Sequence, residues 1–224
     1  MNNTTKKGII AVLVIVLVLL VDQVSKIWVK TNMALYDMIH ITDWFKIYFV
    51  ENSGMAFGLE AEGTKLYLTL FRIIAAIAIT FYLTNILKKG YKLGFVVCIA
   101  LVLAGASGNI IDSVFYGKIF EASYEGYIAS RVPWGEGYTS LFHGKVVDMF
   151  YFPIWTKILP DGSEKVYFFR FIFNVADSAI SVGVALLLIF YRKTLSYSLL
   201  SKKDREKLDR ERQEQLEKEA VRES

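Results

Sequence analysis

Long apolar segments alternate with polar connections along the 224-residue chain. Because about 20 mostly apolar residues are needed to cross a bilayer, four of these segments are long enough to be membrane spans. We expect the spans at about residues 8–28, 66–87, 93–116 and 168–191. Proline would interrupt such a helix, and all three prolines fall between the third and fourth spans. The pattern predicts an all-α integral membrane protein with four transmembrane helices.

The first span also has features of a secretory signal peptide. Lys6 and Lys7 precede a continuous apolar run from Ile9 to Val21, as in the basic and apolar regions of such a leader. No small-x-small cleavage site follows this run, and the helical pattern continues to Lys26. We therefore interpret the segment as a retained first helix.

Basic residues predict the orientation of these spans in the membrane. They gather, without neighbouring acids, at Lys6, Lys7, Lys88, Lys89, Lys92, Arg192 and Lys193. These residues mark the N-terminus, the turn between the second and third spans, and the end of the fourth span, and the positive-inside rule places all three in the cytoplasm. The loops of about 30–65 and 117–167 then lie outside. We expect residues 1–193 to form the membrane domain, with a small extracytoplasmic β or loop subdomain. Residues 194–224 alternate in charge and predict a cytoplasmic tail, either a solvated helix or a disordered extension.

Composition agrees with a protein that is mostly embedded in lipid. The hydrophobic content of 54% and the mean hydropathy of +0.38 exceed what one soluble core of this size needs. The net charge is only +4, and membrane orientation explains the basic clusters better than a nucleic-acid partner does. The single cysteine, Cys98, excludes a disulfide framework and a cysteine metal cluster.

Two aspartates lie in strongly apolar surroundings. A charged side chain at membrane depth costs at least a few kcal/mol, so such residues usually mark a functional site. Asp177 opens the fourth span, and Asp148 lies in residues 146–155, an apolar stretch too short to span a membrane. Both aspartates could thus meet near the outer surface. The alternative is a buried acid that is simply paired with an arginine or lysine.

Other polar residues gather at the outer ends of the spans. They are Asp22, Lys26, Asn109, Asp112 and Asn174. Residues three or four apart share a helix face, so these side chains could simply join helices. That explanation does not account for the lack of similar clusters at the inner ends. In the outer loop, the small residues near Asn52 and Gly54 permit close backbone approach, although alone they indicate no more than a turn.

Five sequence blocks, in this order, resemble the lipoprotein signal peptidases, the type II signal peptidases of bacteria. The blocks are Asp22-Gln-Val-Ser-Lys26, Asn52-Ser-Gly54-Met-Ala56-Phe57, Gly108-Asn109-Ile-Ile-Asp112, Val146-Val147-Asp148-Met-Phe and Phe173-Asn174-Val-Ala-Asp177-Ser178. The resemblance implies a four-helix aspartyl peptidase of the bacterial inner membrane, with both termini in the cytoplasm and the active site near the outer leaflet. It also implies diacylglyceryl-modified prolipoproteins as substrates, cut just before the modified cysteine, and inhibition by the cyclic peptide globomycin.

The resemblance assigns the catalytic pair to Asp148 and Asp177, the two acids that the apolar surroundings had singled out. Two neighbouring carboxylates share a proton, so one can activate water while the other acts as an acid. This chemistry requires neither a metal nor another cofactor. The resemblance further implies that three asparagines, Asn52, Asn109 and Asn174, position the dyad or the substrate. It implies that the charged residues Asp22, Lys26 and Asp112 support the site. It also implies that the loop residues Gly54, Ala56 and Phe57 receive the lipid-bearing substrate.

Two departures from the family pattern stand out. Ser113 occupies a position where the family generally carries an arginine. If the fourth span is helical from residue 168, Arg170 lies about 20° from Asp177 around the helix and could supply that charge, or else extend to the membrane interface. The second departure is residues 113–147, which separate Asp112 from Asp148 and predict either a lid or docking surface or an inert loop.

Two other classes of function are compatible with intramembrane acids. A small proton-coupled transporter or channel would also place Asp and Asn inside helices. Its path should continue toward the cytoplasm, yet the inner halves of the first, third and fourth spans lack ionisable groups, and Arg72 in the second span is the exception. A membrane scaffold without catalysis would tolerate replacement of each acid by asparagine. We favour the peptidase.

Overall fold

The computed structural model describes residues 2–54, 64–158, 164–166 and 170–223. The chain divides into two compact units, Met1–Val184 and Ala185–Ser224, whereas we expected a boundary near residue 193. The elements, in chain order, are α1 (Asn3–Asn32), β1 (Met38–Thr42), β2 (Phe45–Asn52), α2 (Thr64–Lys88), α3 (Leu93–Ile111), the π-helical turn η2 (Asp112–Tyr116), α4 (Gly117–Ile119), β3 (Val146–Tyr151), β4 (Thr156–Ile158), β5 (Glu164–Val166), β6 (Ile172–Phe173), α5 (Val175–Phe190), α6 (Arg192–Leu199) and α7 (Lys202–Glu223).

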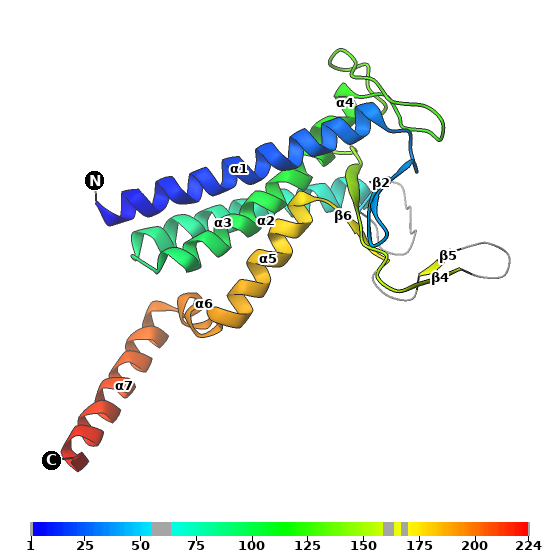
Figure 1. Ribbon diagram of the computed structural model, residues 1–224. Helices are drawn as coiled ribbons and strands as arrows, with labels where there is room; N and C mark the ends of the chain where they lie inside the picture. Colours follow the sequence, from blue (N-terminus) through cyan, green and yellow to red (C-terminus); the bar gives the residue numbers. More distant parts are fainter. Residues whose placement is uncertain (1, 55–63, 159–163, 167–169, 224) are drawn as a thin grey trace. The chain divides into compact units, whose positions relative to one another are not determined.

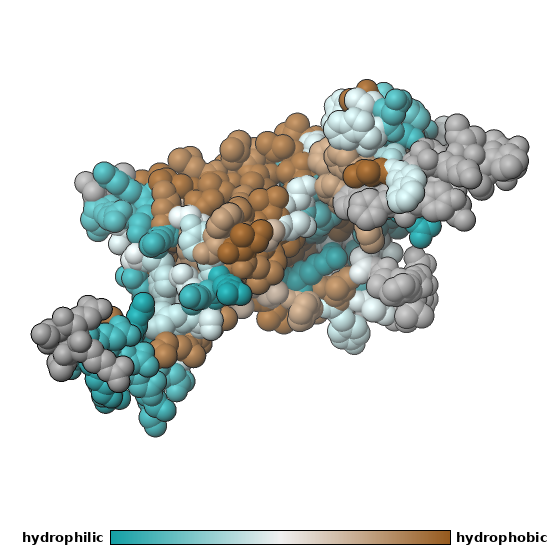
Figure 2. Space-filling view, turned by 60° about the horizontal axis from the view of Figure 1, so that its bottom comes forward, coloured by the Kyte–Doolittle hydropathy of each residue, from teal (hydrophilic) through white to brown (hydrophobic). Residues whose placement is uncertain are grey.

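Among the residues that the structure describes, three helical segments are long and apolar enough to cross a membrane: α1, α2 and the continuous stretch Leu93–Ile119. The bent pair of α5 and α6, whose axes meet at 92°, would make a fourth span if counted as one. The first three lie side by side, with a small sheet at one end of the bundle (Figure 1). Large apolar side chains cover the outside of this helical part (Figure 2), as expected of surfaces that face lipid.

The small sheet has the strand order β1-β2-β3-β6, and every pair is antiparallel. Strand β3 lies inside the sheet and pairs Asp148 with Val50 of β2. A buried cluster joins the sheet to the end of α1 and to the segment from η2 to the end of α4, and consists of Val29, Met33, Phe49, Tyr116, Phe120, Val147 and Met149. This core fixes β3, and with it Asp148, against the end of the helix bundle that carries the sheet.

Helix α5 begins at Val175, whereas we expected the span to begin at about residue 168. The preceding residues Ile172 and Phe173 form β6 and pair with β3, because β-branched and aromatic side chains favour strands. Asn174 then starts the helix: its Oδ1 accepts from Asp177 N at 2.9 Å, and Asp177 Oδ2 accepts from Asn174 N at 3.4 Å. This reciprocal arrangement is a capping box, and it makes Asp177 part of the helix start.

The segment between η2 and β3 folds into a lobe that is fixed to α1 and β2. Within it, Glu121 Oε2 accepts from Tyr127 Oη at 2.7 Å and from Ser130 N at 2.9 Å. The buried Lys30 Nζ donates to Ser123 Oγ at 2.8 Å and forms an ion pair with Glu51 of β2. The inserted residues are therefore anchored to the same strand that carries Asn52.

The second unit contains the end of α5, the helix α6 and the long helix α7. Helix α7 alternates basic and acidic side chains, including ion pairs between Lys202 and Glu206 and between Lys207 and Glu211. Such exposed pairs contribute little stability. Of the two forms expected for the tail, the structure thus has the solvated helix.

Helices α3 and α5 approach each other closely at Gly105. A Cβ atom on this residue would lie 2.2 Å from the backbone oxygen of Ala176. Backbone atoms cannot move away as the end of a flexible side chain can, so a larger residue must separate the helices. Small residues commonly permit such contacts between membrane helices.

We predict that Gly105→Ala lowers the free energy of unfolding by about 1–3 kcal/mol, the usual cost of overpacking. The thermal unfolding of the purified protein in detergent micelles measures this effect. Gly8→Ala is the matched control, because Gly8 is also helical and has no neighbouring atom within 4 Å of an added Cβ. Unfolding of Gly105→Ala at the wild-type temperature would contradict the close helix contact.

Candidate active site

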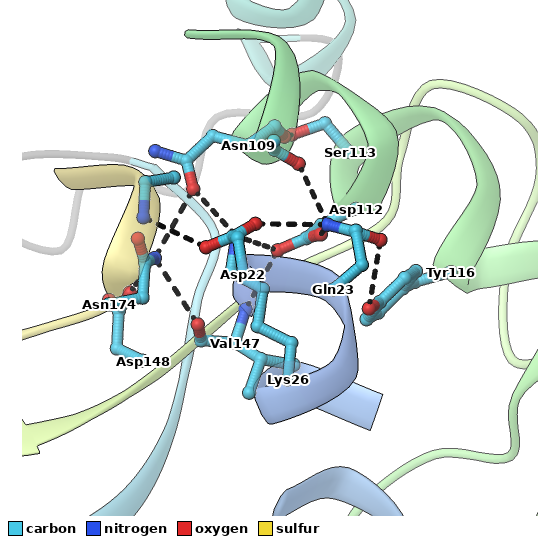
Figure 3. Close-up of polar contacts among 12 residues, drawn as sticks. Asp22, Gln23, Lys26, Asn109, Asp112, Ser113, Tyr116, Val147, Asp148 and Asn174 are labelled. Carbon is cyan, nitrogen blue, oxygen red and sulfur yellow. Dashed lines mark hydrogen bonds and ion pairs between the residues drawn. The ribbon is translucent and has the colours of Figure 1, made fainter. Parts of the chain in front are cut away.

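A buried lysine joins the C-terminal parts of α1 and α3. Lys26 Nζ lies 2.9 Å from Asp22 Oδ2 and 2.8 Å from Asp112 Oδ2, and it donates to Asn109 Oδ1 at 2.9 Å (Figure 3). Lys26, Asp22 and Asp112 are each 0% exposed. An ammonium has three donors, so these partners satisfy it completely. The structure thus brings together all four residues that the sequence placed at these helix ends.

Both aspartates extend this cluster to further elements. Asp22 Oδ1 accepts from Ala176 N at 2.8 Å, which satisfies one of the N–H groups left unpaired in the first turn of α5. Asp112 Oδ2 accepts from Val147 N in β3 at 3.3 Å. The Lys26 cluster therefore fixes α1, η2, α5 and β3 relative to one another.

Gln23 belongs to the same cluster, although sequence reasoning did not select it. Its Nε2 donates to Asp22 Oδ2 at 3.0 Å and to Asp112 Oδ1 at 2.9 Å, while Tyr116 Oη donates to its Oε1 at 3.2 Å. The available signal was its place between two selected residues on the first span. A polar amide in that position fills the acceptor sites that Lys26 leaves open.

Asn174 connects the Lys26 cluster to Asp148. Its buried Nδ2 lies 2.7 Å from Asp148 Oδ1, 3.2 Å from Asn109 Oδ1 and 3.2 Å from Val147 O. The other oxygen of Asp148 accepts from Asn52 Nδ2 at 3.1 Å. Amide donors from β2 and from the start of α5 therefore hold both oxygens of this carboxylate.

Asp177 is held by the remaining asparagine and by its own helix start. Asn109 Nδ2 donates to Asp177 Oδ1 at 2.8 Å, and Asn174 N donates to Asp177 Oδ2 at 3.4 Å. Asn174 thus contacts both aspartates, one through its side chain and the other through its backbone. The three asparagines expected to position the dyad all bond to one aspartate or both.

The two carboxylates have different electrostatic surroundings. Asp148 is 3% exposed, and this burial raises its pKa to about 7, with the charge of Asp177 acting in the same direction. The hydrogen bonds from Asn52 and Asn174 oppose that rise. Asp177 lies in the first turn of α5, where the helix dipole and free N–H groups favour a negative charge. The pair can therefore hold one proton and one charge.

A tight turn orients Asn52 toward Asp148. Gly54 N donates to Asn52 Oδ1 at 2.6 Å, and Gly54 has a φ angle of +79°, which glycine adopts readily. Such a side-chain turn fixes the amide with its Nδ2 facing the carboxylate. Ala56 and Phe57, which we expected in the same loop, lie outside the described residues.

Two arginines are candidates for the positive charge that the family generally carries at the position of Ser113. Arg72 of α2 donates from Nη1 to Ser113 Oγ at 3.3 Å, a contact that the sequence did not reveal. Arg170 is exposed and precedes β6. It therefore lies outside the helix that contains Asp177, and the predicted separation of about 20° around that helix does not apply. A role for Arg170 at the site stays a prediction.

Comparisons with known proteins agree with this geometry. The model of the family "Signal peptidase (SPase) II" matches residues 14–193. The lipoprotein signal peptidase of Porphyromonas gingivalis is 49% identical over 203 residues, covering 88% of this chain and 89% of that one. The lipoprotein signal peptidase of Amoebophilus asiaticus is 37% identical over 189 residues, covering 80% and 76%.

A solved structure described as a bacterial membrane enzyme, determined by the in meso method at 2.3 Å resolution, has a TM-score of 0.57. It is 27% identical to this chain, and the match covers 86% of this chain and 93% of that one. The family match thus extends from α1 to the end of α5 and includes the sheet and the polar cluster. The chain belongs to the lipoprotein signal peptidases, aspartic peptidases of the signal peptidase II family that remove signal peptides from prolipoproteins.

Proposed function

We propose that this chain cleaves prolipoproteins just before the diacylglyceryl-modified cysteine, with Asp148 and Asp177 as the catalytic pair. The assignment rests on the hydrogen bonds that Asn174 makes to both carboxylates. A second supporting fact is the contrast between a deeply buried Asp148 and an Asp177 at a helix start. An acid and a base made from the same residue type need such a difference.

In this mechanism Asp177 is the base and Asp148 is the acid. The Asp177 carboxylate takes a proton from a water whose oxygen forms a bond to the scissile carbonyl carbon. The protonated Asp148 hydrogen-bonds to the carbonyl oxygen and then gives its proton to the leaving amine as the C–N bond breaks. The pair finishes with one proton, now on Asp177, and its transfer back to Asp148 restores the starting state.

The surrounding residues position this pair. Asn52, Asn109 and Asn174 donate to the carboxylates without adding charge, so the dyad keeps its shared proton. Asp22, Lys26 and Asp112 fix the elements that carry the dyad. Family membership does not favour a transporter or channel, because the proposed acid–base role of the aspartates needs no ion path through the membrane.

The substrate sets the place of the site in the membrane. A diacylglyceryl group keeps the cleavage point at the surface of the bilayer, so we place the dyad and the sheet near the outer leaflet of the inner membrane, with both termini in the cytoplasm. The loop of Gly54, Ala56 and Phe57 would then receive the lipid-bearing segment. Globomycin, a cyclic peptide, would inhibit by occupying the same place.

Replacing either aspartate by asparagine should lower kcat by about 100-fold to 10,000-fold, because an amide keeps the shape but cannot transfer the proton. The two losses should not add, since the residues act as one unit. The assay is cleavage of a lipobox peptide carrying the diacylglyceryl group. Asp43→Asn, on an exposed acid, is the control. Substantial turnover by Asp148→Asn or by Asp177→Asn would exclude the dyad.

The pH profile should report the proton on Asp148. With its pKa raised to about 7, Asp148 is neutral below this pH and loses its acid form as the pH rises, so kcat/KM should fall on the alkaline side with a midpoint near 7. Asn52→Ala removes a hydrogen bond that favours the carboxylate, and this limb should then move to higher pH. A rate that keeps rising through pH 9 would rule out Asp148 as the acid.

Thiol labelling tests the orientation. Cysteines replace the exposed residues Glu125 and Lys89, one at a time, in a Cys98→Ala background. An impermeant thiol reagent added to intact cells should modify the cysteine at 125 and leave the one at 89 unmodified, because the positive-inside rule places 89 in the cytoplasm. The reverse pattern would put the dyad on the cytoplasmic side.

A further inference from the structure

One face of the first half of α2 carries polar side chains at positions 65, 69 and 72. Positions 65, 69 and 72 are four and three residues apart, so they lie on the same side. These side chains bond to three different segments: Lys65 Nζ to Ser53 O at 2.8 Å, Thr69 Oγ1 to Phe142 O at 2.9 Å, and Arg72 Nη1 to Ser113 Oγ at 3.3 Å. The helix thus meets the polar site through this face.

Arg72 connects to both halves of the dyad. Ser113, which accepts from Arg72, donates to the backbone oxygen of Asn109 at 2.9 Å, and the side chain of Asn109 donates to Asp177. On the other side, a Cβ on Gly54 would lie 2.9 Å from Arg72 Nη2. The guanidinium therefore fills the space beside the turn that orients Asn52 toward Asp148.

The charged cluster beside the dyad would be balanced by one more positive charge. Lys26 is paired with two aspartates, Asp22 and Asp112, so this cluster carries a net negative charge beside the dyad. A negative neighbour favours protonation of both catalytic carboxylates. On α2, Lys65 and Arg72 are the charged groups on the polar face.

We propose that Arg72 is a positioning residue of the peptidase, holding Asp177 in its ionised form beside the protonated Asp148. The inference rests on the proposed dyad and assigns the positive charge to α2 rather than to Arg170. Ser113 anchors the guanidinium, and Gly54 leaves room for it. A nearby positive charge favours the ionised form of a carboxylate, and Arg72 is linked to Asp177 through the hydrogen bonds of Ser113 and Asn109.

The pH profile of kcat/KM tests this role. Arg72→Gln should move the acid limb upward by about one pH unit, so that activity on the acid side of the optimum falls about tenfold. Arg72→Lys keeps the charge and should leave the limb near its wild-type position. Adding Ser113→Arg to Arg72→Gln should bring the limb back. Arg131→Gln, on an exposed arginine, is the matched control and should not move it, and Arg170→Gln tests the other candidate for the positive charge.

A second measurement does not depend on catalysis. If Arg72 stabilises an ionised Asp177, the difference in unfolding temperature between wild type and Arg72→Gln should grow as the pH rises, because the carboxylate is neutral at low pH. A difference that is constant with pH, or an acid limb that Arg170→Gln moves instead, would overturn the proposal. If wild type does not cleave the lipobox peptide, the proposed function fails, while the unfolding temperatures still decide the role of Arg72.

Discussion

The arrangement of the site depends on the burial of a single ammonium group. Lys26 has no contact with solvent, and its three donors bond to groups from α1 and the end of α3. Loss of one partner of such a buried ion pair typically costs about 3–5 kcal/mol, because an unpaired charge remains inside. The helices can therefore shift little at this level. Since Asp22 bonds to α5 and Asp112 bonds to β3, the two elements that carry the proposed catalytic residues share the same restraint.

Neutral amides separate this charged support from the dyad. Asn109 bonds to Lys26 through its oxygen and to Asp177 through its nitrogen, and Asn174 bonds to Asn109 and Asp148. An amide transmits position through hydrogen bonds but adds no net charge. The dyad is thus fixed by a lysine that does not directly pair with either carboxylate, which leaves both able to exchange a proton.

The sequence allowed the polar residues to be found but not the contacts between them. The length of the apolar segments predicted helices, and the cost of charge in lipid singled out Asp148 and Asp177. The start of α5 was harder to predict, because residues 168–173 are as apolar as the helix that follows. Residues 172 and 173 form a strand by pairing with β3, which is distant in sequence. The contact of Arg72 with Ser113 joins two helices, and no periodicity within either helix indicates which residues will face each other.

The capping box at the start of α5 has a consequence for the proposed catalytic cycle. Asp177 both accepts from Asn174 N and contributes a carboxylate to the dyad. When Asp177 takes a proton, the acceptor of that N–H loses its charge, and a charge-assisted hydrogen bond is roughly twice as strong as a neutral one. The first turn of α5 is then less firmly held until the proton leaves. Proton transfer and the local order of this helix are therefore thermodynamically linked, so that each turnover loosens and re-forms the same turn that positions Asn174.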